Sequence, residues 1–325
     1  MKWNLLILIL GLRLSLGISQ TKIPSQKINY DSVYSDFTGF VYLDSVVVRA
    51  SRNGFDVSDF IKMVKNDNSF YRAFKNLRFA EYDFDNKLVF FDKKKRKKAG
   101  YASSNHQYFR NRCRWMEVNS TKENYKNLDS KGRYKFYTSK LYDRLFYTHG
   151  KICDQDTSHT LKTDNNSASG MEKYVLELKK LIFSPGKKAN IPLLGSKMEI
   201  FSKKMRKYYN FSITQENYND SIPCYVFTAY LKPNLTISQA DNTVLKYLKT
   251  YFAKKSLQVI RREYHLKYKT LAYNFDVKMS IKLQKKFGKY YPKNIKYDGT
   301  WHVLFKKRET CKFETGIYNI SIKAH

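Results

Sequence analysis

A strict alternation of apolar and polar residues near the C-terminal end restricts the possible folds of this chain more than any other feature. Every second residue between Leu271 and Leu283 is apolar, and the residues between them are small, polar or charged. Successive side chains of a β-strand point to opposite faces, so the pattern predicts a strand with one buried and one solvated face. The apolar set is Leu271, Tyr273, Phe275, Val277, Met279, Ile281 and Leu283.

The same end of the chain holds further strand candidates with short connections. We expect strands at 225–231, 245–252, 257–265, 295–305 and 312–322, with links such as 253–256 and Tyr297-Asp298-Gly299. Sequential strands joined by short links pair antiparallel. The 27 Tyr and 22 Phe residues suit half-buried pleated surfaces. We therefore predict an α+β, β-dominated fold, with a curved antiparallel sheet (an open barrel) and a few helices.

The first half of the chain gives a mixed pattern. A strand at 40–50 should precede a helix around Phe60 and Val64, and Asp85-Asn86 predicts a turn between strands at 77–84 and 88–92. Residues 99–118 form a further strand region, and 133–145 fit either a helix or a strand. The polar segment 154–170 is predicted to be a mobile loop or a boundary. The expected division is an extended arm at 20–40, an N-terminal α+β half at 41–153 and a C-terminal meander half at 171–325, and the two halves could form one domain.

The first nineteen residues have the layout of a secretory signal peptide. Lys2 provides a positive start, an apolar run follows at 3–12, and Gly17 and Ser19 stand at the −3 and −1 positions of a cut before Gln20. The run is too short to remain as a membrane span. We expect an exported chain, located in the periplasm, on the cell surface or outside the cell, with no membrane span after cleavage.

Positive charge dominates the composition. The chain has 61 Lys and Arg against 28 Asp and Glu, a formal net charge of +33. Such a field attracts anionic surfaces at low salt. The densest cluster is predicted to be a hairpin tip that contacts an anionic surface, and nucleic acid is not expected as a partner because the chain carries an export signal. This cluster comprises Lys93, Lys94, Lys95, Arg96, Lys97 and Lys98.

Four cysteines would enter an oxidising compartment, where disulfides persist. Cys113, Cys153, Cys224 and Cys311 allow three pairings, and their spacing contains no CxxC motif that would suggest zinc. We favour Cys113–Cys153 because this pair closes the shortest sequential loop.

Two stretches resemble known families. Residues 43–50 and 54–60 resemble the strand-then-helix stretch of exported proteins of Bacteroidota. Residues 251–264, which read Tyr-Phe-Ala-Lys-Lys-Ser-Leu-Gln-Val-Ile-Arg-Arg-Glu-Tyr, look like the paired strands of open-barrel (LolA/LolB-like) lipoprotein carriers. The second resemblance implies a curved sheet that wraps short helices and can hold acyl chains. The chain departs from the outer-membrane receptor of that group in having no lipobox cysteine.

Catalytic and metal-binding motifs were sought in the sequence. The six histidines form neither HxH nor HExxH, and there is no GxSxG elbow or glycine-rich phosphate loop. Ser184 and Lys187 match S-x-x-K, but Pro185-Gly186 between them breaks the helix that this geometry needs. We therefore assign no catalytic residue, metal site or cofactor, and an enzyme assembled from distant residues stays open.

These features favour a non-enzymatic exported protein that holds a lipid or amphipathic ligand in the concave face of the sheet. The candidate ligand contacts are Tyr273, Phe275, Val277, Met279 and Trp301. The alternative is a basic surface adhesin or host-interaction protein that binds acidic glycans or phospholipid head groups.

Overall fold

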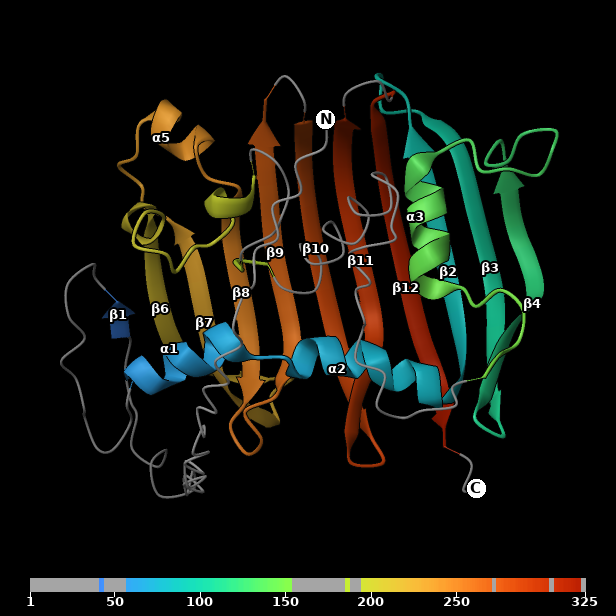
Figure 1. Cartoon of the computed structure of the whole chain (residues 1–325), viewed down its shortest axis with the longest axis horizontal. Helices are drawn as coiled ribbons and strands as arrows, with labels where there is room; N and C mark the ends of the chain where they lie inside the picture. The colour runs from blue at the N-terminus through green and yellow to red at the C-terminus, as the bar shows by residue number, and fades with distance from the viewer. Residues whose placement is uncertain are drawn as a thin grey trace, which may run out of the picture.

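One large open sheet forms the body of the molecule. The computed structural model describes residues 41–43, 57–153, 185–187, 194–270, 273–303 and 307–322. Within these ranges, twelve strands join in the order β1-β6-β7-β8-β9-β10-β11-β12-β2-β3-β4-β5 (Figure 1). The strands are β1 (Val41–Leu43), β2 (Glu81–Phe91), β3 (Lys97–Arg110), β4 (Cys113–Tyr125), β5 (Ile152–Cys153), β6 (Tyr209–Tyr218), β7 (Ile222–Leu231), β8 (Leu245–Ala253), β9 (Val259–Lys269), β10 (Tyr273–Lys286), β11 (Lys289–Val303) and β12 (Glu309–Ser321).

Every neighbouring pair in this order is antiparallel, and the last strand links the two halves of the sequence. Strands β6 to β12 follow chain order as a meander, and β12 then pairs with β2, for example through Lys312 and Val89. In the described residues β1 and β5 lie at opposite ends of the order, so the sheet does not close. The predicted β-dominated, open antiparallel fold is confirmed. The signal peptide and the polar segment 154–170 lie outside the described residues, and the proposed division into halves stays a prediction.

Helices cover one face of the sheet, which we call the inner face. They are α1 (Val57–Asn66), α2 (Ser69–Asn76), α3 (Tyr137–Phe146) and α5 (Ile237–Asp241), with short 3-10 turns η1 (Leu77–Phe79), η2 (Gly195–Lys197) and η3 (Arg206–Tyr208). Figure 1 shows α1 and α2 crossing the lower part of the sheet and α3 following β12 and β2. None of the described helices is long and apolar enough to cross a membrane.

Aromatic packing holds these helices on the inner face. The Phe60 ring of α1 lies 5.7 Å from Tyr225 and 5.5 Å from Phe252, centroid to centroid. In α3, the Tyr142 ring lies 5.1 Å from Phe313, and its hydroxyl is 2.6 Å from the Thr315 hydroxyl. Large buried aromatic surfaces of this kind contribute strongly to the core.

A buried ion pair fixes the corner between α1 and α2. The Arg262 guanidinium of β9 lies 3.4 Å from the Asp67 carboxylate, and both side chains are under a tenth exposed. Arg262 also donates to the Thr250 hydroxyl and lies 4.4 Å from the centre of the Phe70 ring. Asp67 accepts hydrogen bonds from the Ser69 amide and hydroxyl. Since buried charges are costly unless paired, each member of this pair depends on the other.

The alternation of apolar and polar residues predicted for 271–283 is observed in β10. Met279, Ile281 and Leu283 are at most 5% exposed and point into the core, and Phe275 and Val277 pack against it. The intervening Lys278 is exposed, and Ser280 and Lys282 are half-buried on the opposite, outer face. The prediction of a one-sided strand is therefore confirmed for positions 274–283.

The predicted turn at Asp85-Asn86 is wrong, because β2 runs without interruption through both residues. Asn86 is 4% exposed, and its amide donates to the Ser103 hydroxyl and the Tyr147 hydroxyl. Asp85 accepts a hydrogen bond from the Ser104 hydroxyl. The Asn86 amide nitrogen and the Asp85 carboxylate thus have partners within the fold, although Asn86 Oδ1 is buried with no hydrogen-bond partner. The chain instead turns at Asp92–Arg96, so the lysine cluster does form the predicted hairpin tip.

The expected link at Tyr297-Asp298-Gly299 is also wrong, since these residues lie in the middle of β11. Asp298 points outward and pairs with Lys312 at 2.9 Å. Gly299 serves packing, because a Cβ at this position would overlap the hydroxyl of Tyr297. Glycine therefore leaves the space that the Tyr297 ring occupies on the inner face.

Two predictions for the N-terminal half are refined by the structure. The one strand region expected at 99–118 is parts of two strands, β3 and β4, because the chain turns at Asn111-Arg112, which have φ of 50° and 58°. The ambiguous segment 133–145 contributes most of α3. Cys113 and Cys153 form a disulfide between β4 and β5, as predicted, while Cys224 and Cys311 are buried free thiols.

Candidate functional site

An aromatic surface lies on the inner face at the upper ends of β9, β10 and β11. We call it the upper inner wall, and it consists of Tyr268, Phe275, Val277, Tyr297 and Trp301. Phe275 is the direct cross-strand partner of both Tyr268 and Trp301. All except Tyr268 are half-buried, whereas Tyr268 is 5% exposed. Figure 1 shows that none of the described helices lies over this part of the sheet.

The polar atoms at the border of the wall have protein partners. The Trp301 indole Nε1 donates to the Thr138 hydroxyl at 2.7 Å. Lys197 Nζ donates to the Tyr268 hydroxyl at 2.6 Å and lies 4.9 Å from the centre of that ring. Satisfied polar groups leave an apolar surface, with one ammonium group, Lys197, at its edge.

The α3 end of the wall is fixed by Glu309 of β12. Its carboxylate accepts hydrogen bonds from the backbone amides of Tyr137 and Thr138, at 2.7 and 2.9 Å, and from the Thr138 hydroxyl at 2.6 Å. A carboxylate at the first turn of a helix satisfies free amides and complements the helix dipole. These bonds hold Thr138 in the position where its hydroxyl accepts the hydrogen bond from the Trp301 indole.

The floor of the wall consists of neutral aromatic side chains. The Tyr297 and Phe313 rings stack at 4.7 Å with planes 3° apart. The Tyr264 hydroxyl donates to Met279 Sδ at 2.8 Å. Burial raises the pKa of both Tyr264 and Tyr297 well above the ordinary tyrosine range, so both hydroxyls stay uncharged. This surface suits hydrocarbon and not an ionised group.

The structure brings most of the predicted ligand contacts onto this one face. Phe275, Val277 and Trp301 belong to the wall, and Met279 lies below it in the packed core at 5% exposure. The side chain of Tyr273 lies outside the described residues, although its backbone pairs with Val303. The sequence pointed to neither Tyr268 nor Tyr297, because Tyr268 was placed beyond a predicted strand and Tyr297 in a predicted link.

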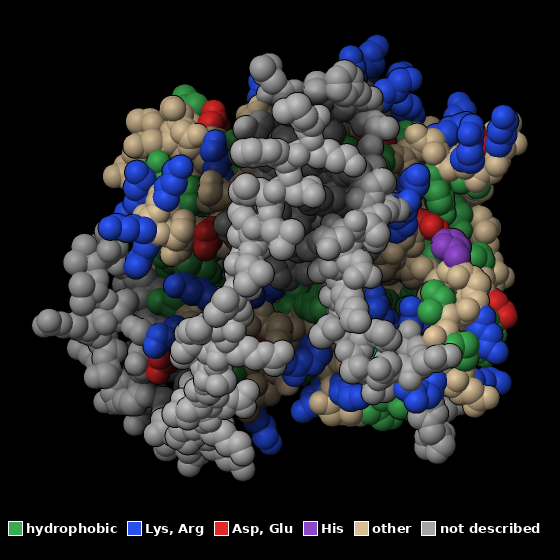
Figure 2. Space-filling view, in the orientation of Figure 1, with side chains coloured by type: hydrophobic (Ala, Val, Ile, Leu, Met, Phe, Trp, Pro, Cys, Tyr) green, Lys and Arg blue, Asp and Glu red, His purple; other side chains and the backbone are tan. Residues whose placement is uncertain are grey.

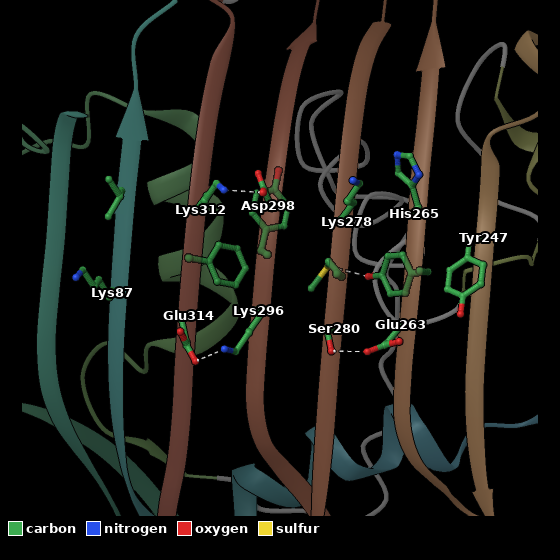
Figure 3. A pocket seen from close by; sticks show the side chains of 15 residues that line it. Lys87, Tyr247, Glu263, His265, Lys278, Ser280, Lys296, Asp298, Lys312 and Glu314 are labelled. Carbon is green, nitrogen blue, oxygen red and sulfur yellow. Dashed lines mark hydrogen bonds and ion pairs between the residues drawn. The ribbon is translucent and has the colours of Figure 1, made fainter. Parts of the chain in front are cut away.

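A second candidate surface lies on the outer face of the same strands. It is a groove of about 620 Å³ between two rows of side chains that cross β8 to β12 and β2 (Figure 3). Four further residues border the groove, although their side chains belong to or pack against the core of the inner face: Tyr264, Met279, Tyr297 and Phe313. The upper row is Tyr247, His265, Lys278, Asp298 and Lys312, and the lower row is Glu263, Ser280, Lys296, Glu314 and Lys87.

Charges in this groove largely neutralise one another. Lys312 pairs with Asp298 at 2.9 Å and Lys296 with Glu314 at 3.0 Å, both visible in Figure 3. Hydrogen bonds from Lys296 and from Asn294 lower the pKa of Glu314. Exposed pairs of this kind form readily on a solvated sheet face and contribute little free energy each.

The groove continues into a second hollow of about 420 Å³ near the upper ends of β9 and β10. Here His265 Nε2 lies 2.7 Å from Asp276, and Lys267 lies 3.4 Å from the same carboxylate. Burial opposes ionisation of Asp276, but the hydrogen bond and charge of His265, with Lys267, outweigh it and lower its pKa. Within the described ranges, no group of three His, Cys, Asp or Glu side chains is placed to hold a metal ion.

The predicted anionic-surface cluster lies at the upper edge of the sheet, at the β2–β3 tip. The Asp92 carboxylate accepts from the amides of Lys94 and Arg96 and from Arg96 Nε. The backbone amide of Arg96 is the main reason that the pKa of Asp92 is lowered. Figure 2 shows Lys and Arg side chains gathered along this edge. A contact between Lys93–Lys98 and an anionic surface stays a prediction.

Comparisons with known proteins give only distant likenesses. No family model matches the chain, and no curated protein matches its sequence significantly. A DUF1329 family protein from Desulfovibrio piger aligns with 81% of this chain and 93% of its own, at 10% identity and a TM-score of 0.27. The sequence resemblance to exported proteins of Bacteroidota receives no support from these comparisons.

Two further solved structures give likenesses that are as distant. A putative outer membrane lipoprotein-sorting protein domain from Vibrio parahaemolyticus covers 78% of this chain and 94% of its own, at 6% identity and a TM-score of 0.27. A LolA superfamily protein from Nitrosomonas europaea covers 80% and 96%, at 7% identity and a TM-score of 0.22.

Proposed function

We propose that this chain is an exported, non-enzymatic binding protein that holds a lipid or other amphipathic ligand against the upper inner wall. The single observation that carries the proposal is the half-buried apolar surface on an open sheet, which consists of Phe275, Val277, Tyr297 and Trp301. Apolar surface of this kind gains about 25 cal/mol for each Å² that a ligand removes from water.

The wall also provides different surroundings for the apolar and the polar end of such a ligand. The Trp301 indole and the Tyr268 hydroxyl are already hydrogen-bonded within the protein, so an acyl chain leaves neither of these groups unsatisfied. Lys197 Nζ lies at the border, where it could face a polar or anionic head group. The Cys113–Cys153 disulfide and the predicted signal peptide are both in keeping with an exported protein.

The adhesin alternative is not favoured. On the outer groove, the cations Lys296 and Lys312 are each matched by a carboxylate, Glu314 and Asp298, so this face offers mixed charge to an acidic glycan. Opposite charges placed side by side cancel much of the field that a polyanion would feel.

Mass spectrometry of an organic extract of the purified protein tests the proposal. We expect a molecule with an acyl chain or a comparable apolar body in the parent protein and a smaller amount in the Phe275→Ala variant. Lys278→Ala, which changes the exposed neighbour on the outer face, is the matched control and should retain the full amount. An extract without such a molecule, together with failure to take up added fatty acid, would reject the proposal.

A further inference from the structure

The tip of the β10–β11 hairpin has an unusual residue for its backbone geometry. Lys286 and Lys289 are direct partners, so the loop consists of Phe287 and Gly288 alone. Both have positive φ, 49° and 73°, as two-residue hairpin turns of type I′ require. Asn-Gly is the preferred sequence for this turn, and a bulky side chain at positive φ is unfavourable. Phe287 therefore costs conformational free energy where Asn would not.

Two further features at this tip oppose folding. The Phe287 side chain is 62% exposed, which leaves a large apolar ring in water. Lys286 and Lys289, placed directly opposite each other, repel. In the described part of the chain, no ion pair joins Lys285, Lys286 or Lys289 to an acidic residue, and all three are exposed. An exposed ring surrounded by uncompensated ammonium groups suggests a partner that supplies both apolar contact and negative charge.

The basic tip at the other end of the sheet provides an internal contrast. At the β2–β3 tip, Lys95 also has positive φ, at 61°, but Asp92 binds the loop amides and the Arg96 guanidinium. No large hydrophobic residue is exposed between Asp92 and Lys98. In the β2–β3 loop, Asp92 provides hydrogen bonds and a negative charge from within the loop. In the described residues, the tip at Phe287 has no such acidic partner.

We propose that the β10–β11 tip docks on an anionic lipid bilayer surface. The Phe287 ring would enter the boundary between head groups and acyl chains, while the ammonium groups of Lys285, Lys286 and Lys289 stay at the level of the phosphates. Figure 1 shows this hairpin projecting below α2 at the lower edge of the sheet, free of the described helices. Nucleic acid or an acidic glycan would supply the charge but no apolar phase for the ring.

Co-sedimentation of the purified protein with lipid vesicles tests the proposal. We expect binding to vesicles of phosphatidylglycerol in phosphatidylcholine and much weaker binding to phosphatidylcholine alone. Phe287→Asn should weaken binding about tenfold through the lost ring. Lys286→Ser or Lys289→Ser should each weaken it about fivefold. Phe287→Asn should keep or raise the melting temperature, because Asn suits the turn, so loss of binding would not reflect unfolding.

Lys94→Ser at the β2–β3 tip removes the same charge and should change the vesicle affinity less than twofold. Equal affinity of Phe287→Asn and the parent protein for anionic vesicles would overturn the proposal. So would an equal loss by Phe287→Asn on immobilised heparin, which has no apolar phase. Vesicle binding by this tip does not depend on a ligand at the upper inner wall. Failure both to extract a lipid and to take up fatty acid would reject the proposed function and leave the vesicle results unaffected.

Discussion

The two faces of the sheet are made by the same strands yet have opposite chemistry. On β10, Met279 and Ile281 are at most 5% exposed on the inner face, while their neighbour Lys278 is exposed on the outer one. In the upper inner wall and its floor, aromatic contacts and neutral hydroxyls dominate, whereas the groove on the outer face is lined by paired charges. The outer groove therefore has the character of a solvated surface, although the structure forms a cavity there. The upper inner wall is half-buried and apolar, as the proposed ligand site requires.

Inserting a lysine into each face should produce the largest difference in unfolding free energy between the two faces. Met279→Lys places an ammonium group against Tyr264 and the core, and we expect it to cost about 3–5 kcal/mol of unfolding free energy or to prevent folding. Ser280→Lys on the outer face, beside Glu263, should change that free energy by less than about 0.5 kcal/mol. Urea unfolding measures both, and similar losses would show that the faces are not distinct.

Removing one partner of the buried Arg262–Asp67 ion pair on the inner face should lower the unfolding free energy nearly as much. Asp67→Ala leaves Arg262 without its carboxylate in a buried site, and we expect a loss of about 3–5 kcal/mol in urea unfolding. The matched change on the outer face is Asp276→Ala, which removes the partner of His265 and Lys267. Asp276 is 44% exposed, so this change should cost less than about 1 kcal/mol. A larger loss for Asp276→Ala would reverse the comparison.

Sequence reasoning found the features that depend on local patterns. Alternation identified β10 and its facing, because one register puts Lys278 and Lys282 into water and the other would bury them. Loop length selected Cys113–Cys153, and charge density located the β2–β3 tip.

The remaining features depend on contacts between residues that are distant in sequence. Asn86 lies within a strand, where its amide nitrogen donates to Ser103 and Tyr147, and Asp298 lies within a strand, where it pairs with Lys312. The outer groove could not be predicted, since its rows draw single residues from six strands. The sequence alone does not show that Phe287 is unfavourable at its position. That follows only from the two-residue turn, which gives Phe287 a positive φ.

Replacing one glycine by alanine on each face tests the difference in packing between the faces with a smaller change in stability. Gly299→Ala on the inner face would overlap the Tyr297 hydroxyl and displace a ring that stacks on Phe313, at a cost of about 1–3 kcal/mol. Gly316→Ala on the outer face of β12 meets no atom within 4 Å and should be neutral or slightly stabilising. Thermal unfolding of both variants decides this, and equal melting temperatures would contradict the assigned packing of Tyr297.

The smallest expected effect concerns the pH dependence of an outer-face pair. The folded pKa of Glu314 lies below its usual value of 4.5, so the pair with Lys296 stabilises the fold above that pH. This contribution is lost as the pH falls through the folded pKa. Lys296→Ser should remove a small part of the stability difference between neutral and acid pH, with less than about 1 kcal/mol at stake. A slope unchanged by Lys296→Ser would mean that the pair does not form in solution.

The two tryptophans outside the predicted signal peptide allow the most direct test of the central claim, that ligand binds the inner face. Trp301 lies in the upper inner wall, whereas Trp115 stacks on Tyr108 on the outer face at 5.1 Å. A fatty acid brominated on its acyl chain quenches tryptophans that it touches. We predict strong, saturable quenching in Trp115→Phe, which keeps Trp301, and little in Trp301→Phe. Quenching confined to Trp115, or absent from both variants, would contradict the account.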